Sequence, residues 1–156
     1  MDPTRRLLLS GALMFLLALI LAVPPFVYQV PNPRYMRTFH IEGVTNGVWL
    51  YALAFMWPHL NLGAIEQLLL EVCMHIGTWT NFLPWAICGY TGANLNGEFS
   101  PGMDTGSPSP PGTEIYAQGL FYSLVACTIT AILAAALTVL GLIRAAPIDR
   151  TNRKQE

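Results

Sequence analysis

Four long apolar runs decide what this chain can fold into. Residues 7–28, 44–60 and 115–143 contain no Asp, Glu, Lys or Arg, and residues 62–90 contain only two glutamates. Each run approaches or exceeds the roughly 17–25 apolar residues that a membrane-spanning helix requires. Charged residues make up 11% of the whole chain, whereas an ordinary soluble domain has about 25%. These features exclude a soluble globular enzyme and a disordered chain.

The expected fold is all-α, an integral membrane four-helix bundle that forms a single domain over residues 1–156. We expect the helices at about 7–28, 41–60, 62–90 and 115–143.

Prolines mark where the expected helices end or bend. Pro24-Pro25 should end or kink the first helix, Asn32-Pro33 marks a turn, and Pro84 should break the third helix. The polar stretch 91–114 contains four prolines. We therefore expect it to be an exposed loop.

Basic residues favour one orientation of this bundle. Two of them, Arg34 and Arg37, would lie on one side of the membrane, and the other six would lie on the side of the termini. Cytoplasmic loops carry the excess of Lys and Arg, so we expect a multi-pass protein with both termini cytoplasmic. The first run is too long for the apolar core of a signal peptide and lacks a small-residue cleavage site. The net charge is −1 without a basic run, which gives no footprint for nucleic acid.

The three cysteines lie inside the apolar runs. Their odd number argues against a disulfide scaffold, and we expect them to be small packing residues.

Polar residues inside apolar helices are costly and are functional candidates. In the second run, His40, Gly43, Asn46 and Gly47 share a face because residues three or four apart lie above one another. Gly43 and Gly47 have the GxxxG spacing, which indicates either close helix packing or room for a flat ligand. His40, at the expected outer end of the helix, is either a wet interfacial side chain or a ligand residue. Glu42 fits a first helical turn, where the dipole favours a carboxylate.

The third run contains two further pairs at helical spacing, Glu71 with His75 and Asn81 with Trp85. Glu71 and His75 form either a buried pair that stabilises the bundle or part of a proton path. In antiparallel helices that rise about 1.5 Å per residue, Asn46 and Asn81 lie at similar depth. Their amides should converge there, either as a clasp between helices or as a polar site.

The histidines cannot share one metal ion within the chain. His40 and His59 would lie about 28 Å apart along one helix, and His75 about 20 Å from the outer level. An iron held by His40 would therefore keep its other axial position open. An open position fits substrate binding better than simple electron transfer.

Ordered motifs on these helices carry a resemblance to known membrane enzymes. They are Asn32-Pro33-Arg34, His40-Ile41-Glu42-Gly43-Val44-Thr45-Asn46-Gly47, Trp57-Pro58-His59-Leu60 and Gly77-Thr78-Trp79-Thr80-Asn81. Over about residues 32–85 the chain resembles the hydroxylaminobenzene mutases. It is also similar to the styrene oxide isomerases, which share the histidine and the Asn-Gly pair six residues later.

The resemblance to the isomerases implies a homotrimer of four-helix subunits with haem b near the subunit interface. His40 would hold the iron and Asn46 would orient the substrate oxygen, while Trp85 stands where the isomerases have a pocket tyrosine. The expected haem contacts are His40, Gly43 and Gly47, with His40 as the metal ligand, and the expected catalytic residues are Asn46, Asn81 and Trp85.

The resemblance further implies a redox-neutral isomerisation of a small apolar or aromatic substrate. Ferric haem would act as a Lewis acid. The substrate would be an epoxide, rearranged to a carbonyl compound, or an arylhydroxylamine, rearranged to an aminophenol. Trp79 and Phe82 are candidate walls of a pocket that keeps water out.

Two other classes of function stay open. One is a non-catalytic haem or quinone subunit of an electron-transfer complex, which needs a second axial ligand. The other is a small transporter in which Glu66, Glu71 and His75 line a proton path.

Overall fold

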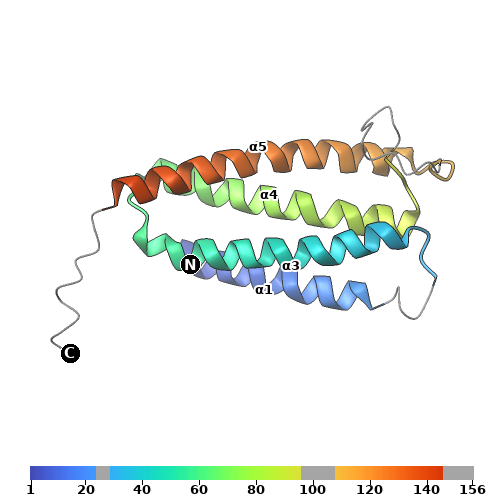
Figure 1. Ribbon diagram of the computed structural model, residues 1–156, viewed down its shortest axis with the longest axis horizontal. Helices are drawn as coiled ribbons and strands as arrows, with labels where there is room; N and C mark the ends of the chain where they lie inside the picture. Colours follow the sequence, from blue (N-terminus) through green and yellow to red (C-terminus); the bar gives the residue numbers. More distant parts are fainter. Residues whose placement is uncertain (24–28, 96–107, 146–156) are drawn as a thin grey trace.

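The computed structural model describes residues 1–23, 29–95 and 108–145, which form four long helices (Figure 1). The elements are α1 (Pro3–Ala22), α3 (Pro33–Met56), the short 3-10 helix η1 (Trp57–His59), α4 (Ala64–Thr91) and α5 (Glu114–Arg144). The expected all-α, four-helix fold is confirmed.

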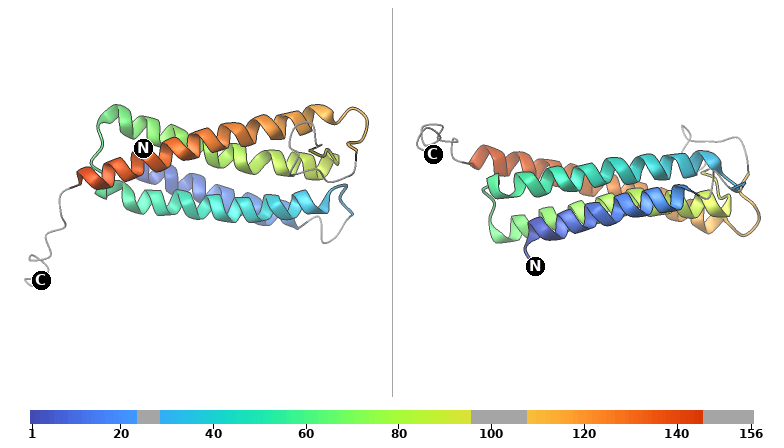
Figure 2. Two further views of the ribbon diagram at one scale, coloured as in Figure 1. Left: turned by 45° about the horizontal axis from the view of Figure 1, so that its top comes forward. Right: turned by 90° about the horizontal axis from the view of Figure 1, so that it is seen from below.

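Two helix hairpins make up the bundle. α1 packs along α3, α4 packs along α5, and α3 against α4 joins the two pairs. Figure 2 shows α3 beside α1, with α4 and α5 forming the second pair. α3 and α5 make few direct contacts, and Figure 1 shows α4 between them.

Capping residues set the start of α3 eight residues before the expected position. The Asn32 side chain accepts the Tyr35 N–H at 3.2 Å, and Pro33 occupies the first turn. Both are typical signals of a helix start, so the expected start at 41 was wrong. His40 therefore lies two turns inside α3, away from its outer end.

Helix α4 continues through Pro84, where a break was expected. A proline removes one backbone donor from a helix, and α4 stays helical on both sides of this position. α4 ends instead at Gly92, whose left-handed φ of 77° needs no Cβ. The Gly92 N–H donates to the Cys88 carbonyl at 2.9 Å.

The first residues of the expected exposed loop are buried. Ala93 and Leu95 are fully covered, and the Leu95 N–H donates to Tyr35 Oη at 3.0 Å. Asn94 accepts a hydrogen bond from Asn32 Nδ2 at 2.7 Å. This part of the loop thus closes one end of the bundle, and residues 96–107 lie outside the described part of the chain.

At the opposite end, the turn between η1 and α4 holds the end of α5. The Asn61 backbone N–H donates to the Gly141 carbonyl at 3.1 Å, and Asn61 Nδ2 donates to the Arg144 carbonyl at 2.9 Å. Arg144 also pairs with Glu66 at 2.8 Å. Carbonyls that a helix end leaves unpaired are satisfied here by the turn.

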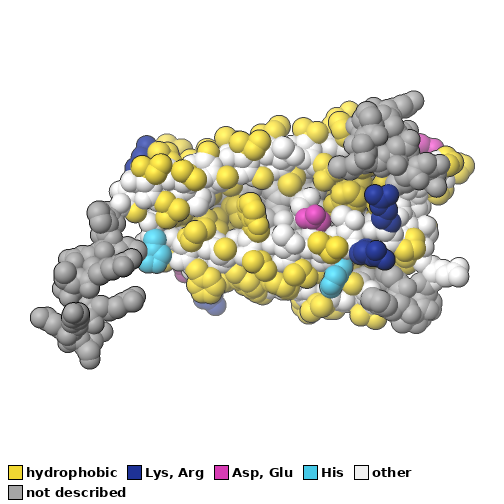
Figure 3. Space-filling model, in the orientation of Figure 1, with side chains coloured by type: hydrophobic (Ala, Val, Ile, Leu, Met, Phe, Trp, Pro, Cys, Tyr) yellow, Lys and Arg dark blue, Asp and Glu magenta, His cyan; other side chains and the backbone are white. Residues whose placement is uncertain are grey.

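Helices α1 and α5 are long and apolar enough to cross a membrane. α3 and α4 have 24 and 28 residues, which is also enough length, but they carry more polar residues. Hydrophobic side chains cover much of the face shown in Figure 3, with Lys and Arg towards its ends. The expected effect of Pro24 and Pro25 on α1 lies outside the described residues.

Candidate functional site

The contact between α3 and α4 is a ladder of paired side chains. Phe39 stacks on Phe82 with ring centroids 4.3 Å apart, and Tyr35 meets Trp85 edge to face at 5.1 Å. One turn deeper, Glu42 Oε2 accepts a hydrogen bond from Asn81 Nδ2 at 2.6 Å. The two helices are antiparallel, so these rungs fix their register.

Asn46 and Asn81 lie on neighbouring rungs, and neither donates to the other. Asn46 Nδ2 donates to the Thr78 backbone carbonyl at 3.4 Å, whereas Asn81 donates to Glu42. Asn46 and Asn81 lie within about one helical turn of each other, as expected. Their side chains do not bond to each other, because each amide donates to a different residue on the facing helix. The Asn46 contact is longer than the usual 2.7–3.2 Å for N–H···O, which leaves this buried amide weakly held.

Glu42 belongs to the middle of α3, and the first-turn role expected for it was wrong. Its carboxylate is partly buried between α3 and α4. The Glu42 carboxylate therefore lies at the contact between α3 and α4.

His40 faces a different helix. Its Nδ1 lies 3.2 Å from the Ala18 backbone carbonyl of α1. A carbonyl only accepts hydrogen bonds, so Nδ1 is the donor here, and the neutral imidazole then has its lone pair on Nε2. Histidines that bind metals are commonly oriented by such a bond through their other nitrogen.

Protein atoms occupy the space beside Gly43 and Gly47 where a side chain would lie. A Cβ on Gly43 would lie 2.5 Å from both Ala18 Cβ and Phe82 Cε2, and a Cβ on Gly47 would lie 2.8 Å from Phe15. The close-packing interpretation of the GxxxG spacing is therefore confirmed. This arrangement leaves no space for a flat ligand above either glycine.

Trp85 carries an unusual polar group. Its side chain is 8% exposed, and its Nε1–H is the one buried side-chain polar atom among the described residues without a hydrogen-bond partner. By contrast, Trp79 Nε1 donates to Ser10 Oγ at 2.9 Å. An unpaired buried donor costs about 1–3 kcal/mol, so Trp85 is a candidate for contact with a ligand.

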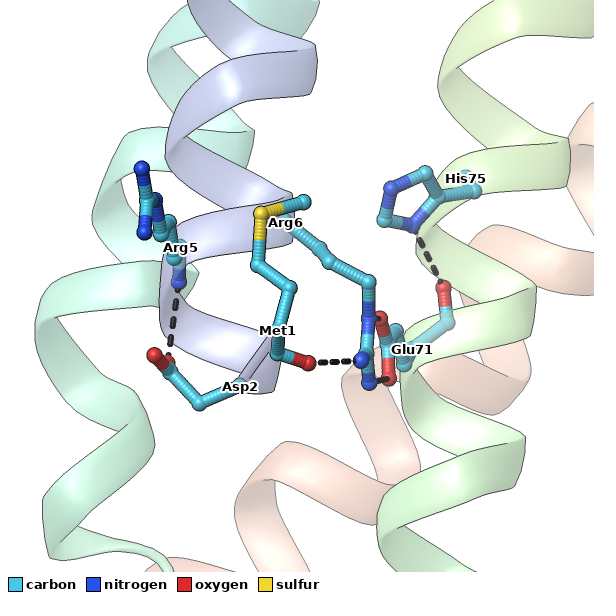
Figure 4. Close-up of polar contacts among 6 residues, drawn as sticks. All are labelled: Met1, Asp2, Arg5, Arg6, Glu71 and His75. Atoms are coloured by element: carbon cyan, nitrogen blue, oxygen red, sulfur yellow. Dashed lines mark hydrogen bonds and ion pairs between the residues drawn. The ribbon is translucent and has the colours of Figure 1, made fainter.

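The cluster around Glu71 has a structural role (Figure 4). Arg6 of α1 forms a bidentate pair with Glu71 of α4, and its Nη1 also donates to the Met1 carbonyl. His75 Nδ1 lies 3.0 Å from the Glu71 backbone carbonyl. The expected Glu71–His75 side-chain pair is not formed, because Glu71 instead fastens α1 to α4.

Two grooves flank α4. The first, here called the α3–α5 groove, has a volume of about 320 Å³ and is lined by Trp49 and Met56 of α3, Met74 of α4 and Ala134 and Ala135 of α5, among others. The second has a volume of about 460 Å³ and is lined by residues of α4, including His75, Trp79 and Pro84, with Ser123 of α5. The sequence did not lead us to expect the α3–α5 groove. The three consecutive alanines at 134–136 are a signal for it, because their small side chains leave space beside α5.

No group of three or more His, Cys, Asp or Glu side chains that could hold a metal ion occurs among the described residues. All three cysteines are free thiols, as expected.

Comparison with known proteins identifies the chain's relatives. The family model of styrene oxide isomerase matches residues 3–143. Hydroxylaminobenzene mutase HabB of Ectopseudomonas oleovorans is 33% identical over 151 residues, which cover 95% of this chain and 85% of the relative. Hydroxylaminobenzene mutase HabA of the same organism is 31% identical over 135 residues, covering 86% of this chain and 95% of the relative. No solved structure matches. The chain therefore belongs to the styrene oxide isomerase family and is an isomerase.

Proposed function

We propose that the chain is a membrane isomerase that uses haem b, held by His40, to rearrange a small aryl epoxide or an arylhydroxylamine without net oxidation or reduction. The names of its family and relatives supply these two substrate classes. The observation that carries the haem assignment is the Nδ1 bond of His40 to the Ala18 carbonyl. A hydrogen bond at Nδ1 fixes the orientation of the imidazole ring and leaves Nε2 available to bind a metal.

A ferric haem bound there would supply a Lewis acid that polarises the substrate oxygen. The protein's own residues would bind and orient the substrate. Trp85 offers an unpaired N–H that can donate to a substrate oxygen, and Asn46 offers an amide that Thr78 holds only weakly. The aromatic ladder of Phe39, Phe82 and Trp85 excludes water from the α3–α4 contact, which protects a reactive cation from hydrolysis.

The proposed assembly is a homo-oligomer, a trimer by family resemblance. His40 turns towards α1, while Asn46 and Trp85 turn towards α4. A site that uses both flanks of α3 is completed by a neighbouring copy. We further propose that all four helices lie in the membrane with both termini cytoplasmic, as the basic residues favour.

Turnover by the purified protein tests the proposal directly. Detergent-purified protein is incubated with styrene oxide or N-phenylhydroxylamine in the absence of oxygen, nicotinamide and quinone. We expect a product of unchanged mass, since the reaction only moves bonds within one molecule. Turnover that requires an added electron donor or acceptor would instead support a subunit of an electron-transfer complex.

Trp85→Phe should lower turnover without weakening the fold. The substitution removes the unpaired N–H and keeps most of the ring, so the free energy of unfolding should stay unchanged or rise. A hydrogen bond to the substrate contributes about 0.5–1.5 kcal/mol, and its loss predicts a roughly 2- to 12-fold lower kcat/KM. Steady-state kinetics and thermal unfolding in detergent measure the two effects.

Trp79→Phe is the matched control, because its N–H is already bonded to Ser10. This variant should lose about 1 kcal/mol of stability and keep its turnover per folded molecule. The opposite result would be a stable Trp79→Phe protein and an unstable but fully active Trp85→Phe protein. It would show that Trp85 does not contact the substrate.

A further inference from the structure

We propose that this chain acts on arylhydroxylamines in preference to aryl epoxides, and that Glu42 is the residue that determines this specificity. The inference rests on the proposed function, because it assigns a substrate class to the same site. It follows from the direction of the hydrogen bonds at the α3–α4 contact, where acceptors without partners gather between Asn46 and Trp85.

The first argument is the orientation of the two amides at this contact. Asn81 Nδ2 donates to a carboxylate oxygen of Glu42, and Asn46 Nδ2 donates to the backbone carbonyl of Thr78. An ionised carboxylate and a carbonyl only accept hydrogen bonds, so each amide keeps its NH₂ group on the side of its partner. Both amides therefore offer their carbonyl oxygens to other donors.

The second argument is that Glu42 is satisfied on one oxygen only. Its Oε2 accepts from Asn81, and its Oε1 has no hydrogen-bond partner among the described residues. Glu66 and Glu71, by contrast, are each paired with an arginine. A carboxylate has about four acceptor positions, and a charge in an apolar bundle is costly when they are empty. Oε1 of Glu42 is thus an acceptor that a ligand can use.

The third argument is that protein atoms do not seal off these acceptors. Over the described ranges, Trp85 Nε1 is the one fully buried side-chain nitrogen or oxygen without a partner. The free oxygens of Glu42, Asn46 and Asn81 also have no partner in this part of the chain, so they are not fully buried.

These groups are also close enough for one small molecule to contact them. Residues four apart on a helix are neighbours, so Glu42 lies beside Asn46 on α3, and Asn81 lies beside Trp85 on α4. The hydrogen bond between Glu42 and Asn81 joins the two pairs. The substrate site thus contains one unpaired donor, the Trp85 N–H, and three unpaired acceptors.

The two candidate substrate classes differ in what they offer to these acceptors. An arylhydroxylamine carries an N–H and an O–H, whereas the oxygen of an aryl epoxide only accepts. A site whose polar groups are built to bond a donor rejects an analogue that lacks it, because those groups are then desolvated and left unpaired. The Trp85 N–H can serve the oxygen of either class, so the discrimination comes from Glu42 and its neighbouring acceptors.

Glu42→Gln tests this specificity because it reverses one hydrogen-bonding group and keeps the shape of the side chain. The glutamine carbonyl can still accept from Asn81, and its NH₂ group then replaces the free carboxylate oxygen. We expect kcat/KM for N-phenylhydroxylamine to fall at least about tenfold, as for one hydrogen bond to a charged group. The value for styrene oxide should rise, because the new NH₂ group can donate to the epoxide oxygen.

Glu114→Gln is the matched control. It makes the same chemical change at the exposed first turn of α5, and it should leave the ratio of the two kcat/KM values unchanged. If Glu42 only stabilised the fold, Glu42→Gln would lower both values by the same factor. Such equal losses would overturn the proposal, and so would a higher kcat/KM for styrene oxide than for N-phenylhydroxylamine in the unchanged protein.

Equilibrium dialysis tests the acceptors without any turnover. Benzyl alcohol has an O–H donor, and benzyl methyl ether has a methyl group in place of that hydrogen. Binding to the detergent-purified full-length protein is measured against empty micelles of the same detergent. We expect benzyl alcohol to reach half-saturation at a concentration about tenfold lower than the ether. Glu42→Gln should bring the two concentrations within about threefold, and Glu114→Gln should leave the tenfold ratio unchanged.

The dialysis result separates this inference from the proposed function. Equal binding of the two probes, or a tenfold preference that persists in Glu42→Gln, would show that Glu42 does not select a donor. Absence of turnover with both substrates would contradict the proposed isomerase activity. A tenfold preference that Glu42→Gln removes would still support Glu42 as the group that selects donors.

Discussion

Replacing His40 by alanine should yield a folded bundle without a haem absorption band and without isomerase activity. The imidazole is the one protein group that we assign to the iron, and Ala18 already orients it. Losing a partner that only orients a metal ligand costs 10- to 100-fold, so losing the ligand itself should cost at least about 100-fold in turnover. The Soret absorbance per mole of detergent-purified protein and the rate of product formation measure both losses.

His75→Ala is the matched control. This histidine is also partly buried, but its Nδ1 is bonded within α4 and its neighbour Glu71 pairs with Arg6. It should retain haem and activity. A His40→Ala protein that is haem-free and fully active would defeat the assignment, and a six-coordinate low-spin spectrum in the unchanged protein would favour the electron-transfer alternative.

Gly43→Ala should destabilise the bundle although alanine is the better helix former. The added Cβ would lie 2.5 Å from Ala18 Cβ and from Phe82 Cε2, and overpacking of this kind costs about 1–3 kcal/mol. The gain in helix propensity, about 0.5–1 kcal/mol, only partly offsets it. Thermal unfolding in detergent should therefore shift to lower temperature.

Gly119→Ala provides the control for that prediction. Gly119 lies within α5, and a Cβ there meets nothing within 4 Å. Only the propensity effect remains, so the midpoint of unfolding should stay the same or rise. Equal stability of Gly43→Ala and Gly119→Ala would show that α1, α3 and α4 do not pack as closely as described.

Hydrophobicity alone predicted the extents of the last two helices. The expected ranges 62–90 and 115–143 differ by no more than two residues from Ala64–Thr91 and Glu114–Arg144. Both helices have apolar runs that end at polar or turn-forming residues, so the boundary of the run is also the boundary of the helix.

The start of α3 could not be found in the same way, because caps rather than hydrophobicity set it. Asn32 and Pro33 were interpreted as a turn, and the polar residues that follow them were placed outside the helix. The structure uses Asn32 as the N-cap. With the start expected at residue 41, His40 was placed at the end of the helix and Glu42 in its first turn. The helix dipole favours a carboxylate in a first turn, so Glu42 did not stand out as unusual.

The depth of the polar residues was predictable, and their partners were not. The helical rise correctly placed Asn46 and Asn81 near one another. Which neighbour each amide meets depends on the rotation of α3 against α4, and a single sequence does not fix it. The same holds for Glu71, whose partner Arg6 is 65 residues away on α1.

The opening between α3 and α5 has a consequence for the route that a solute takes. The loop residues at one end of the bundle and the Asn61 turn at the other are both closed by hydrogen bonds, so the groove's free side is lateral. In the proposed membrane placement that side faces the hydrocarbon, so solutes would reach the groove through the lipid. Its occupancy should then scale with the solute's oil–water partition coefficient, which concentrates poorly soluble aromatics many times over at the protein.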